Sequence, residues 1–162
     1  MGASLGNDPG ARIRAVYGKL SGAPGGKRIF SRLIGWMAPY TGTTRARVLE
    51  LDRGFARIEM RDRRRVRNHL RSIHAVALVN LAEETTGLAL MFGLPQGARG
   101  ILTGLSMDYL KKARGTLTAT ARCAIPETTE RREYEVEGEV RDAQGDLVAR
   151  ARARWLIGPS AT

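Results

Sequence analysis

The sequence lacks several features that would indicate an extracellular or membrane location. Cys123 is its only cysteine, so an intrachain disulfide is excluded and a reducing compartment is expected. No uninterrupted apolar run reaches the roughly 18 residues that a membrane span requires. The first residues, MGASLGND, also lack the apolar segment of a signal peptide. We therefore expect a cytoplasmic protein that does not associate with a membrane.

Acidic residues are scarce relative to basic ones. The 16 Asp and Glu against 27 Lys and Arg give a net charge of +11. Residues 1–72 hold 16 basic and 5 acidic side chains and residues 73–162 hold 11 of each, so the whole excess lies in the first segment. Such a charge attracts phosphate groups. Aromatic residues make up only 6%, however, which is few for stacking on bases.

Sequence signatures of nucleic-acid-binding and metal-binding domains are also missing. No zinc-finger, RNP or helix-turn-helix pattern occurs, so we expect nonspecific attraction of nucleic acid at most and no dedicated role. The two histidines, His69 and His74, are only five positions apart, and no cluster of His, Cys and carboxylates has the spacing of metal ligands. We therefore expect neither a metal nor another cofactor.

The hydrophobic pattern predicts one α+β domain. Two helical patterns, 13–20 and 29–37, precede strand-like runs at 43–50 and 55–60, and a long apolar helix is expected from about Ile73 to Phe92. The period then changes to two residues, which predicts four strands in an antiparallel meander. The last two strands carry opposed rows of Glu and Arg, which is typical of a solvated face. The four predicted strands are 103–109, 117–123, 133–140 and 147–155.

A bent antiparallel sheet of about six strands wrapped on the long central helix accommodates this order with short connections. We divide the chain into an N-terminal helical extension packed on the domain, the domain itself and a short tail. These parts are 1–40, 41–158 and 159–162.

Polar residues interrupt the long apolar helix. Asn80, Glu83 and Glu84 lie within it, and Asn68 and His74 precede it. Buried polar groups without partners cost about 1–3 kcal/mol each, so their combination favours a functional role over packing alone.

Asn68, His74 and Leu81-Ala82-Glu83 together resemble the signature of hotdog-fold acyl-CoA thioesterases of the phenylacetyl-CoA thioesterase type. The resemblance implies a hotdog fold, hydrolysis of acyl-CoA, and a homodimer or dimer of dimers with composite sites. Coenzyme A would enter as part of the substrate. The family usually carries glycines where this chain has Arg71 and Ala75-Val76, and the phenylacetyl type carries Asp at the position of Glu83.

Thioester hydrolysis needs a carboxylate and a donor for the developing oxyanion. The N-terminus of the long helix offers free N–H groups at His74 and Ala75. Glu83 lies nine residues after His74, which places it on the far side of the helix and roughly 13 Å along its axis. We therefore predict that Glu83 comes from one protomer and the helix N-terminus from its partner.

The resulting assignment gives each polar residue a role. Glu83 is the base or nucleophile, the Ala75 N–H is the oxyanion donor, and Asn68 and His74 orient the carbonyl or the water. Asn80 lies one turn before Glu83 and Glu84 and could tune either acid, and Glu84 competes with Glu83 for the catalytic role.

A run of arginines before the long helix is explained either by a solvated loop or by recognition of the phosphates of coenzyme A. We take Arg65, Arg67 and Arg71 of this run as candidate ligands of the substrate. A second basic patch comprises Lys111, Lys112 and Arg114.

Two alternatives stay open within the same fold. The separation of His69 from Glu83 resembles the spacing between the His and the acid in hotdog dehydratases and hydratases of acyl thioesters. A hotdog protein that binds acyl-CoA without turnover is also compatible with the missing glycines.

Overall fold

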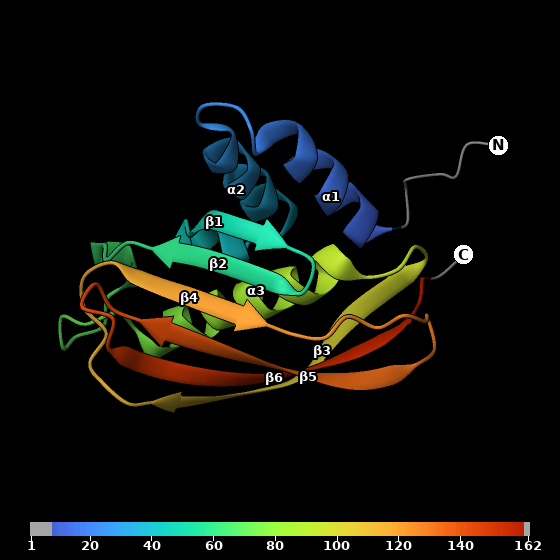
Figure 1. Cartoon of the computed structure of the whole chain (residues 1–162). Coiled ribbons are helices and arrows are strands. Elements are labelled where there is room, and N and C mark those ends of the chain that lie inside the picture. Colours follow the sequence, from blue (N-terminus) through green and yellow to red (C-terminus); the bar gives the residue numbers. More distant parts are fainter. Residues whose placement is uncertain (1–7, 161–162) are drawn as a thin grey trace.

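The computed structural model describes residues 8–160 (Figure 1). The helices are α1 (Pro9–Leu20), α2 (Gly26–Met37) and α3 (Ala75–Gly93), with short 3₁₀ helices η2 (Thr41–Thr44) and η3 (Arg64–Val66). The strands are β1 (Arg47–Asp52), β2 (Phe55–Met60), β3 (Ala98–Tyr109), β4 (Leu117–Arg122), β5 (Arg132–Arg141) and β6 (Leu147–Pro159). The outer ends of our predicted divisions, residues 1–7 and 161–162, lie outside the described residues.

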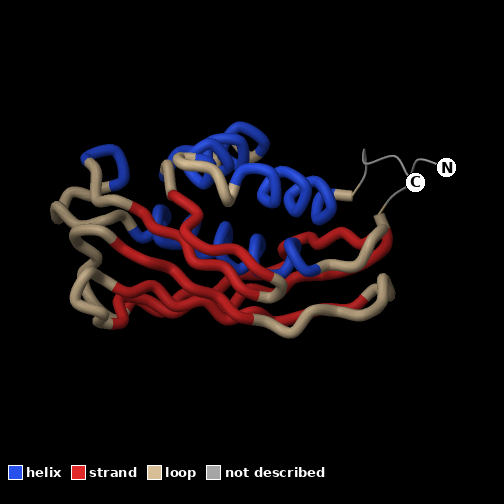
Figure 2. The backbone as a smooth tube through the Cα atoms, turned by 45° about the horizontal axis from the view of Figure 1, so that its top comes forward, coloured by secondary structure: helices blue, strands red, loops and turns tan. Residues whose placement is uncertain are grey.

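The strands form one antiparallel sheet in the order β1-β2-β4-β5-β6-β3. This sheet curves round α3, which runs along its concave face (Figures 1 and 2). The predicted α+β architecture, six strands bent round one long helix, is therefore confirmed.

One detail of the predicted sheet was wrong. We expected the four strands after α3 to form a simple meander, but β3 pairs with β6 and β4 pairs with β2. The connection from β3 to β4 is therefore a crossover and not a hairpin. Its backbone is bonded on both sides, since Leu110 N–H donates to Val148 O and Ala113 O accepts from Ile73 N–H. The predicted helix also begins two residues later, because His74 is its cap.

The core lies between α3 and the inner face of the sheet. Side chains at alternate positions of the strands are buried, as in Ala119 and Ala121 of β4 and Ala151 and Ala153 of β6. By length and composition alone α3 could cross a membrane. Within this fold it is the core helix, because the sheet wraps it and residues such as Leu81 are fully buried.

The outer face of the last two strands carries the predicted rows of opposite charge. Glu137 lies opposite Arg152 and Glu139 opposite Arg150 in the strand register. The corresponding N–O separations are 3.5 and 3.6 Å. Glu137, Arg150 and Arg152 are exposed and Glu139 is half-buried, so these pairs form a solvated face.

The helix α1 holds the C-terminal end of α3. Asp8 caps α1 by accepting from Ala11 N–H, and it also accepts from Gly97 N–H in the loop before β3. Arg14 donates 2.9 Å hydrogen bonds to the carbonyls of Phe92 and Leu94. Carbonyl groups at the C-terminal end of a helix have no hydrogen-bond partner within the helix. Arg14 of α1 provides the missing donor for these two carbonyls.

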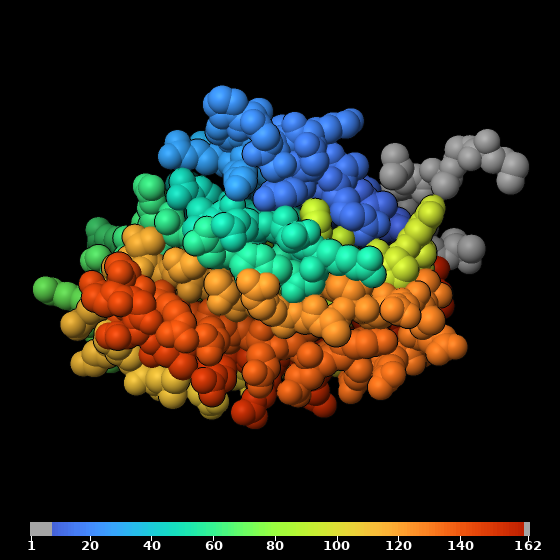
Figure 3. Space-filling model, viewed as in Figure 1, coloured from blue at the N-terminus to red at the C-terminus, as the bar shows by residue number. Residues whose placement is uncertain are grey.

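The helix α2 covers the β1 edge of the sheet (Figure 3). Lys27 Nζ donates to Leu49 O at 2.6 Å, and Ser31 Oγ accepts from Val48 N–H at 2.9 Å. Exposed edge strands pair readily with other chains unless something covers them. The β1 edge is thus protected, whereas the opposite edge, β3, exposes Ile101 and Tyr109.

Candidate active site and arginine pocket

Asn68 organises the loop that leads into α3. Its Oδ1 accepts hydrogen bonds from Leu70 N–H, Ser72 N–H and Ser72 Oγ at 2.9–3.2 Å. Within residues 8–160 its Nδ2 has no acceptor, so the amide N–H groups are available to a ligand.

The same loop contains Arg71 in the left-handed backbone region, with φ at 55°. Hotdog-fold thioesterases of the phenylacetyl-CoA thioesterase type, which the sequence resembles, usually have glycine at this position. Glycine adopts this conformation without steric cost, whereas other residues adopt it rarely. Arg71 therefore adopts the left-handed backbone conformation that glycine would adopt at this position. The replacement of glycine by Arg71 thus gives no reason to expect a different backbone conformation of this loop.

The first turn of α3 exposes one free N–H group. His74 is the N-cap, and its Nδ1 accepts from Val76 N–H at 3.1 Å, so the proton of the neutral imidazole is on Nε2. The Ala75 N–H has no acceptor in the described part of the chain. It therefore retains the partial positive charge of a helix N-terminus.

A pocket of about 350 Å³ adjoins this helix end. It brings together the predicted residues Asn68, Ala75, Lys111 and Lys112 with Tyr109 of β3. Lys111 is held there by Asp142 and Asp146, each 2.6 Å from its Nζ, and their hydrogen bonds raise the pKa of Lys111. Its charge is already balanced, whereas Lys112, which also lines this pocket, forms no ion pair with any of residues 8–160.

Glu83 lies roughly 12 Å further along α3, eight residues after Ala75. Its side chain is half-buried and lines neither this pocket nor the larger one described below. A stripe of half-buried or exposed residues leads to it from the helix start, through Val76 and Val79. One chain therefore does not bring Glu83 and the Ala75 N–H to a single point.

Glu84 and Asn80 lie on another side of α3 and are both buried. Asn80 Nδ2 donates to Tyr40 O at 3.1 Å, but Asn80 Oδ1 and Glu84 Oε2 have no hydrogen-bond partner among residues 8–160. Burial first, and then the charge of Glu83, raise the pKa of Glu84 to about 8. The fold thus changes the proton affinity of Glu84, the acid that the sequence ranked second.

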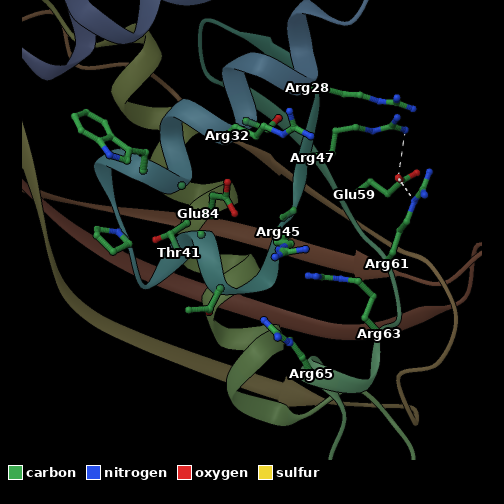
Figure 4. Close-up of a pocket in the computed structure, with 17 residues that line it drawn as sticks. Arg28, Arg32, Thr41, Arg45, Arg47, Glu59, Arg61, Arg63, Arg65 and Glu84 are labelled. Carbon is green, nitrogen blue, oxygen red and sulfur yellow. Dashed lines mark ion pairs between the residues drawn. The ribbon is translucent and has the colours of Figure 1, made fainter.

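Glu84 lines an open pocket of about 1350 Å³ between α2, η2, the adjacent strands β1 and β2, and η3 (Figure 4). Its wall contains seven arginines, Arg28, Arg32, Arg45, Arg47, Arg61, Arg63 and Arg65. We call this the arginine pocket. Only Arg65 of these seven was among the predicted ligands of the substrate.

The other predicted basic residues lie elsewhere. Arg67 is bound to Asp62 at 2.6 Å, and Arg71, Arg114 and His69 are exposed outside both pockets. The sequence signal that could have indicated the cluster was the concentration of the whole net charge in residues 1–72.

Residues 8–160 contain no set of side chains arranged to bind a metal ion. No group of three or more His, Cys, Asp or Glu side chains is close enough to hold an ion. The one thiol, Cys123, is partly buried, and burial raises its pKa to about 11.

Residues 26–157 match the family described as a domain of unknown function, DUF4442. The chain belongs to the DUF4442 family. The match begins at α2 and ends in β6, so the arginine pocket and the whole of α3 lie within the DUF4442 domain. A search of curated proteins finds no match to the sequence.

Solved structures similar to this DUF4442 protein confirm its hotdog-type fold. A structural-genomics crystal structure shares 28% identity over 93% of this chain and 98% of its own, with a TM-score of 0.78. A Pseudomonas aeruginosa protein described as a probable thioesterase shares 22% identity over 81% and 93%, with a TM-score of 0.72.

A third similar structure contains a ligand. It is a hypothetical thioesterase from Streptococcus pneumoniae with coenzyme A, and it shares 18% identity over 72% of this chain and 88% of its own. Its TM-score is 0.61. These neighbours confirm the hotdog fold that the resemblance around Asn68 and Glu83 implied.

Proposed function

We propose that the protein hydrolyses acyl-CoA thioesters to a free acid and coenzyme A. The observation that carries the proposal is the free Ala75 N–H at the start of α3, beside the available amide of Asn68 and in one pocket with it. Further support comes from the thioesterase descriptions of proteins with the same fold, one of them with coenzyme A.

In the proposed reaction, the Ala75 N–H donates to the thioester carbonyl oxygen, where negative charge develops as the carbon becomes tetrahedral. Glu83 removes a proton from water, and the resulting hydroxide adds to the carbonyl carbon. The carbon–sulfur bond then breaks, and the proton passes to the departing thiolate. Asn68 and His74 Nε2 are donors that orient the carbonyl or the water.

Two protomers complete each site in this proposal. Glu83 and the Ala75 N–H of one chain are too far apart to act on one carbonyl, whereas a twofold axis can bring Ala75 close to Glu83 of the partner subunit. The β3 edge supports such an assembly, because it exposes Ile101, Tyr109 and the adjoining Leu110. The opposite edge is covered by α2.

A panel of acyl-CoA thioesters, assayed by release of free thiol, tests the reaction. Glu83→Gln should lower kcat by at least about a hundredfold, because the base is lost. Glu84→Gln is the matched control, with the same change one residue away, and should keep most of the wild-type kcat.

Three other results would contradict the proposal. Activity that survives Glu83→Gln and is lost in Glu84→Gln would transfer the role to the buried acid. An enoyl product without free thiol would indicate the dehydratase alternative. Binding of acyl-CoA with no turnover of any member of the panel would indicate the non-catalytic alternative.

A further inference from the structure

The arginine pocket is not used by the proposed hydrolysis, whose residues lie at the start of α3 and at Glu83. The pocket combines seven arginines with only two acids, Glu59 and Glu84. Even with both acids ionised, the formal charge of its wall is +5 (seven minus two). Like charges at such density repel one another, so a structural purpose would require compensating acids.

Most of these arginines have no compensating acid. Glu59 pairs with Arg47 at 3.2 Å and with Arg61 at 3.7 Å, as the dashed lines in Figure 4 mark. Within residues 8–160 the remaining five, Arg28, Arg32, Arg45, Arg63 and Arg65, form no ion pair. Burial, together with the charges of Arg45 and Arg65, lowers the pKa of Arg63.

Arg45 and Arg63 extend their guanidinium groups toward the same part of the pocket (Figure 4). Arg63 is held in place there by donating to the carbonyl of Thr44. A fixed guanidinium between two other positive charges is a favourable site for an anion, because guanidinium groups bind phosphate oxygens in pairs.

Glu84 provides a second and independent observation. Its side chain lines the same pocket and is only 8% exposed, and its Oε2 has no hydrogen-bond partner in the described part of the chain. None of the arginines bonds to it. Because its pKa is raised to about 8, it is mostly protonated at neutral pH and can donate a hydrogen bond to an anion without repelling it.

The size of the pocket and its one aromatic side chain limit the type of ligand. Its volume of about 1350 Å³ exceeds the roughly 300–1,000 Å³ of most small-molecule sites. Trp36 lines it and is 78% exposed, which leaves an indole face free to stack on a planar group.

We propose that the arginine pocket binds a small ligand that carries two or more phosphate groups. The unpaired guanidinium groups of Arg45, Arg63 and Arg65 bind the phosphates, and Glu84 donates to one of their oxygens. The nucleotide end of coenzyme A and a separate phosphorylated metabolite share this chemistry, and the experiment below distinguishes them.

Calorimetric titration of the full chain with pyrophosphate and with inorganic phosphate tests the proposal. Pyrophosphate should bind more tightly than phosphate. The double variant Arg45→Gln/Arg65→Gln should weaken pyrophosphate binding by about tenfold or more, because charge-assisted hydrogen bonds are lost. Both side chains are exposed and have no hydrogen-bond partner of their own in residues 8–160, so the fold should persist, which circular dichroism checks.

The matched control is Arg99→Gln/Arg131→Gln, which removes the same charge from exposed arginines outside the pocket. It should leave the affinity within about twofold, since exposed charges at a distance are screened by salt. Equal weakening by both double variants would mean a diffuse effect of the net charge and would overturn the proposal. Failure of the wild type to bind pyrophosphate would also overturn it.

Competition identifies the source of the phosphates. If coenzyme A displaces pyrophosphate and Arg45→Gln/Arg65→Gln raises KM for acyl-CoA at unchanged kcat, the pocket holds the nucleotide end of the substrate. If coenzyme A leaves pyrophosphate bound, the ligand is a separate phosphorylated molecule. Neither titration requires turnover, so a failure of the proposed hydrolysis would not affect this result.

Discussion

Glu84 is a carboxyl group that the fold buries without a partner, and its cost to stability depends on pH. Its pKa rises from 4.5 to about 8 on folding. The folded protein therefore holds a proton that the unfolded chain releases between these values. By linkage, stability decreases as pH rises through this range, by about 1.4 kcal/mol per pH unit.

Glu84→Gln should remove this loss. The variant and the wild type should unfold alike near pH 4.5, and the variant should become progressively more stable up to about pH 8. Urea unfolding across this range measures the difference. The control Glu127→Gln changes an exposed carboxyl and should show no such trend. A constant difference between Glu84→Gln and the wild type at all pH values would contradict the assignment.

Arg71 holds a backbone conformation that suits glycine, with φ at 55°. Arg71→Gly should therefore raise the free energy of unfolding by about 0.5–1 kcal/mol, because the left-handed conformation costs a side-chain-bearing residue roughly 1–2 kcal/mol and glycine's greater unfolded-state entropy offsets part of the gain. Arg64→Gly makes the same chemical change in η3, where φ is not positive. It should lower stability, so opposite signs for the two variants are the expected result in chemical denaturation.

For single residues, the sequence indicated which side chains to consider for the site, but not how buried each one is or which partner it has. Asn68 and Ala75, both named from the sequence, line one pocket, and their roles in a reaction stay predictions. The burial of Glu84 and the pairing of Lys111 with two aspartates could not be predicted, because both depend on segments distant in sequence. Asp142 and Asp146, for example, reach Lys111 from the turn between β5 and β6.

Among the structural elements, the contact between α2 and η2 depends on two glycines. A Cβ atom on Gly42 would lie 2.5 Å from the carbonyl oxygen of Gly35, so the backbones would have to separate. Gly42→Ala should lower the free energy of unfolding by about 1–3 kcal/mol. Gly18→Ala in α1 meets nothing within 4 Å and should be neutral or slightly stabilising. Thermal unfolding of the two variants compares them directly.

The three α-helices and six strands were predictable because the hydrophobic period of each is regular over many residues. The 3₁₀ helices were not, and the first predicted strand, 43–50, begins inside η2. The neighbour of β3 was not, because alternation shows which face of a strand is buried but not which strand lies beside it. The short connection from Leu110 to Thr116 suggested a hairpin. The structure uses it as a crossover, whose backbone bonds to Val148 and Ile73.

In the whole molecule, the uneven distribution of charge along the sequence becomes a cluster at one place in the fold. The excess of 11 positive charges in residues 1–72 is concentrated at the arginine pocket, where α2, β1, β2 and the segment after β2 meet. The sequence predicted attraction of phosphate but could not predict this cluster, because its arginines come from three separate segments and only the fold brings them together.

The sharing of the active site between two protomers has a test that uses Ala75. Proline is favoured at the first position of a helix, and His74 before it is extended, with φ at −66° and ψ at 141°, as a residue before proline requires. Ala75→Pro should therefore remove the proposed oxyanion donor without disturbing α3. We expect kcat to fall by about a hundredfold to a thousandfold with an unchanged circular dichroism spectrum.

Mixing two inactive proteins, Ala75→Pro and Glu83→Gln, then tests where the halves of a site come from. After exchange of subunits, each mixed dimer should contain one site with an intact Ala75 N–H and an intact Glu83 from opposite chains. Random exchange makes about half of the dimers mixed, so about one quarter of the wild-type activity should return. If each site belonged to one chain, both chains of the mixed dimer would be defective and no activity would return.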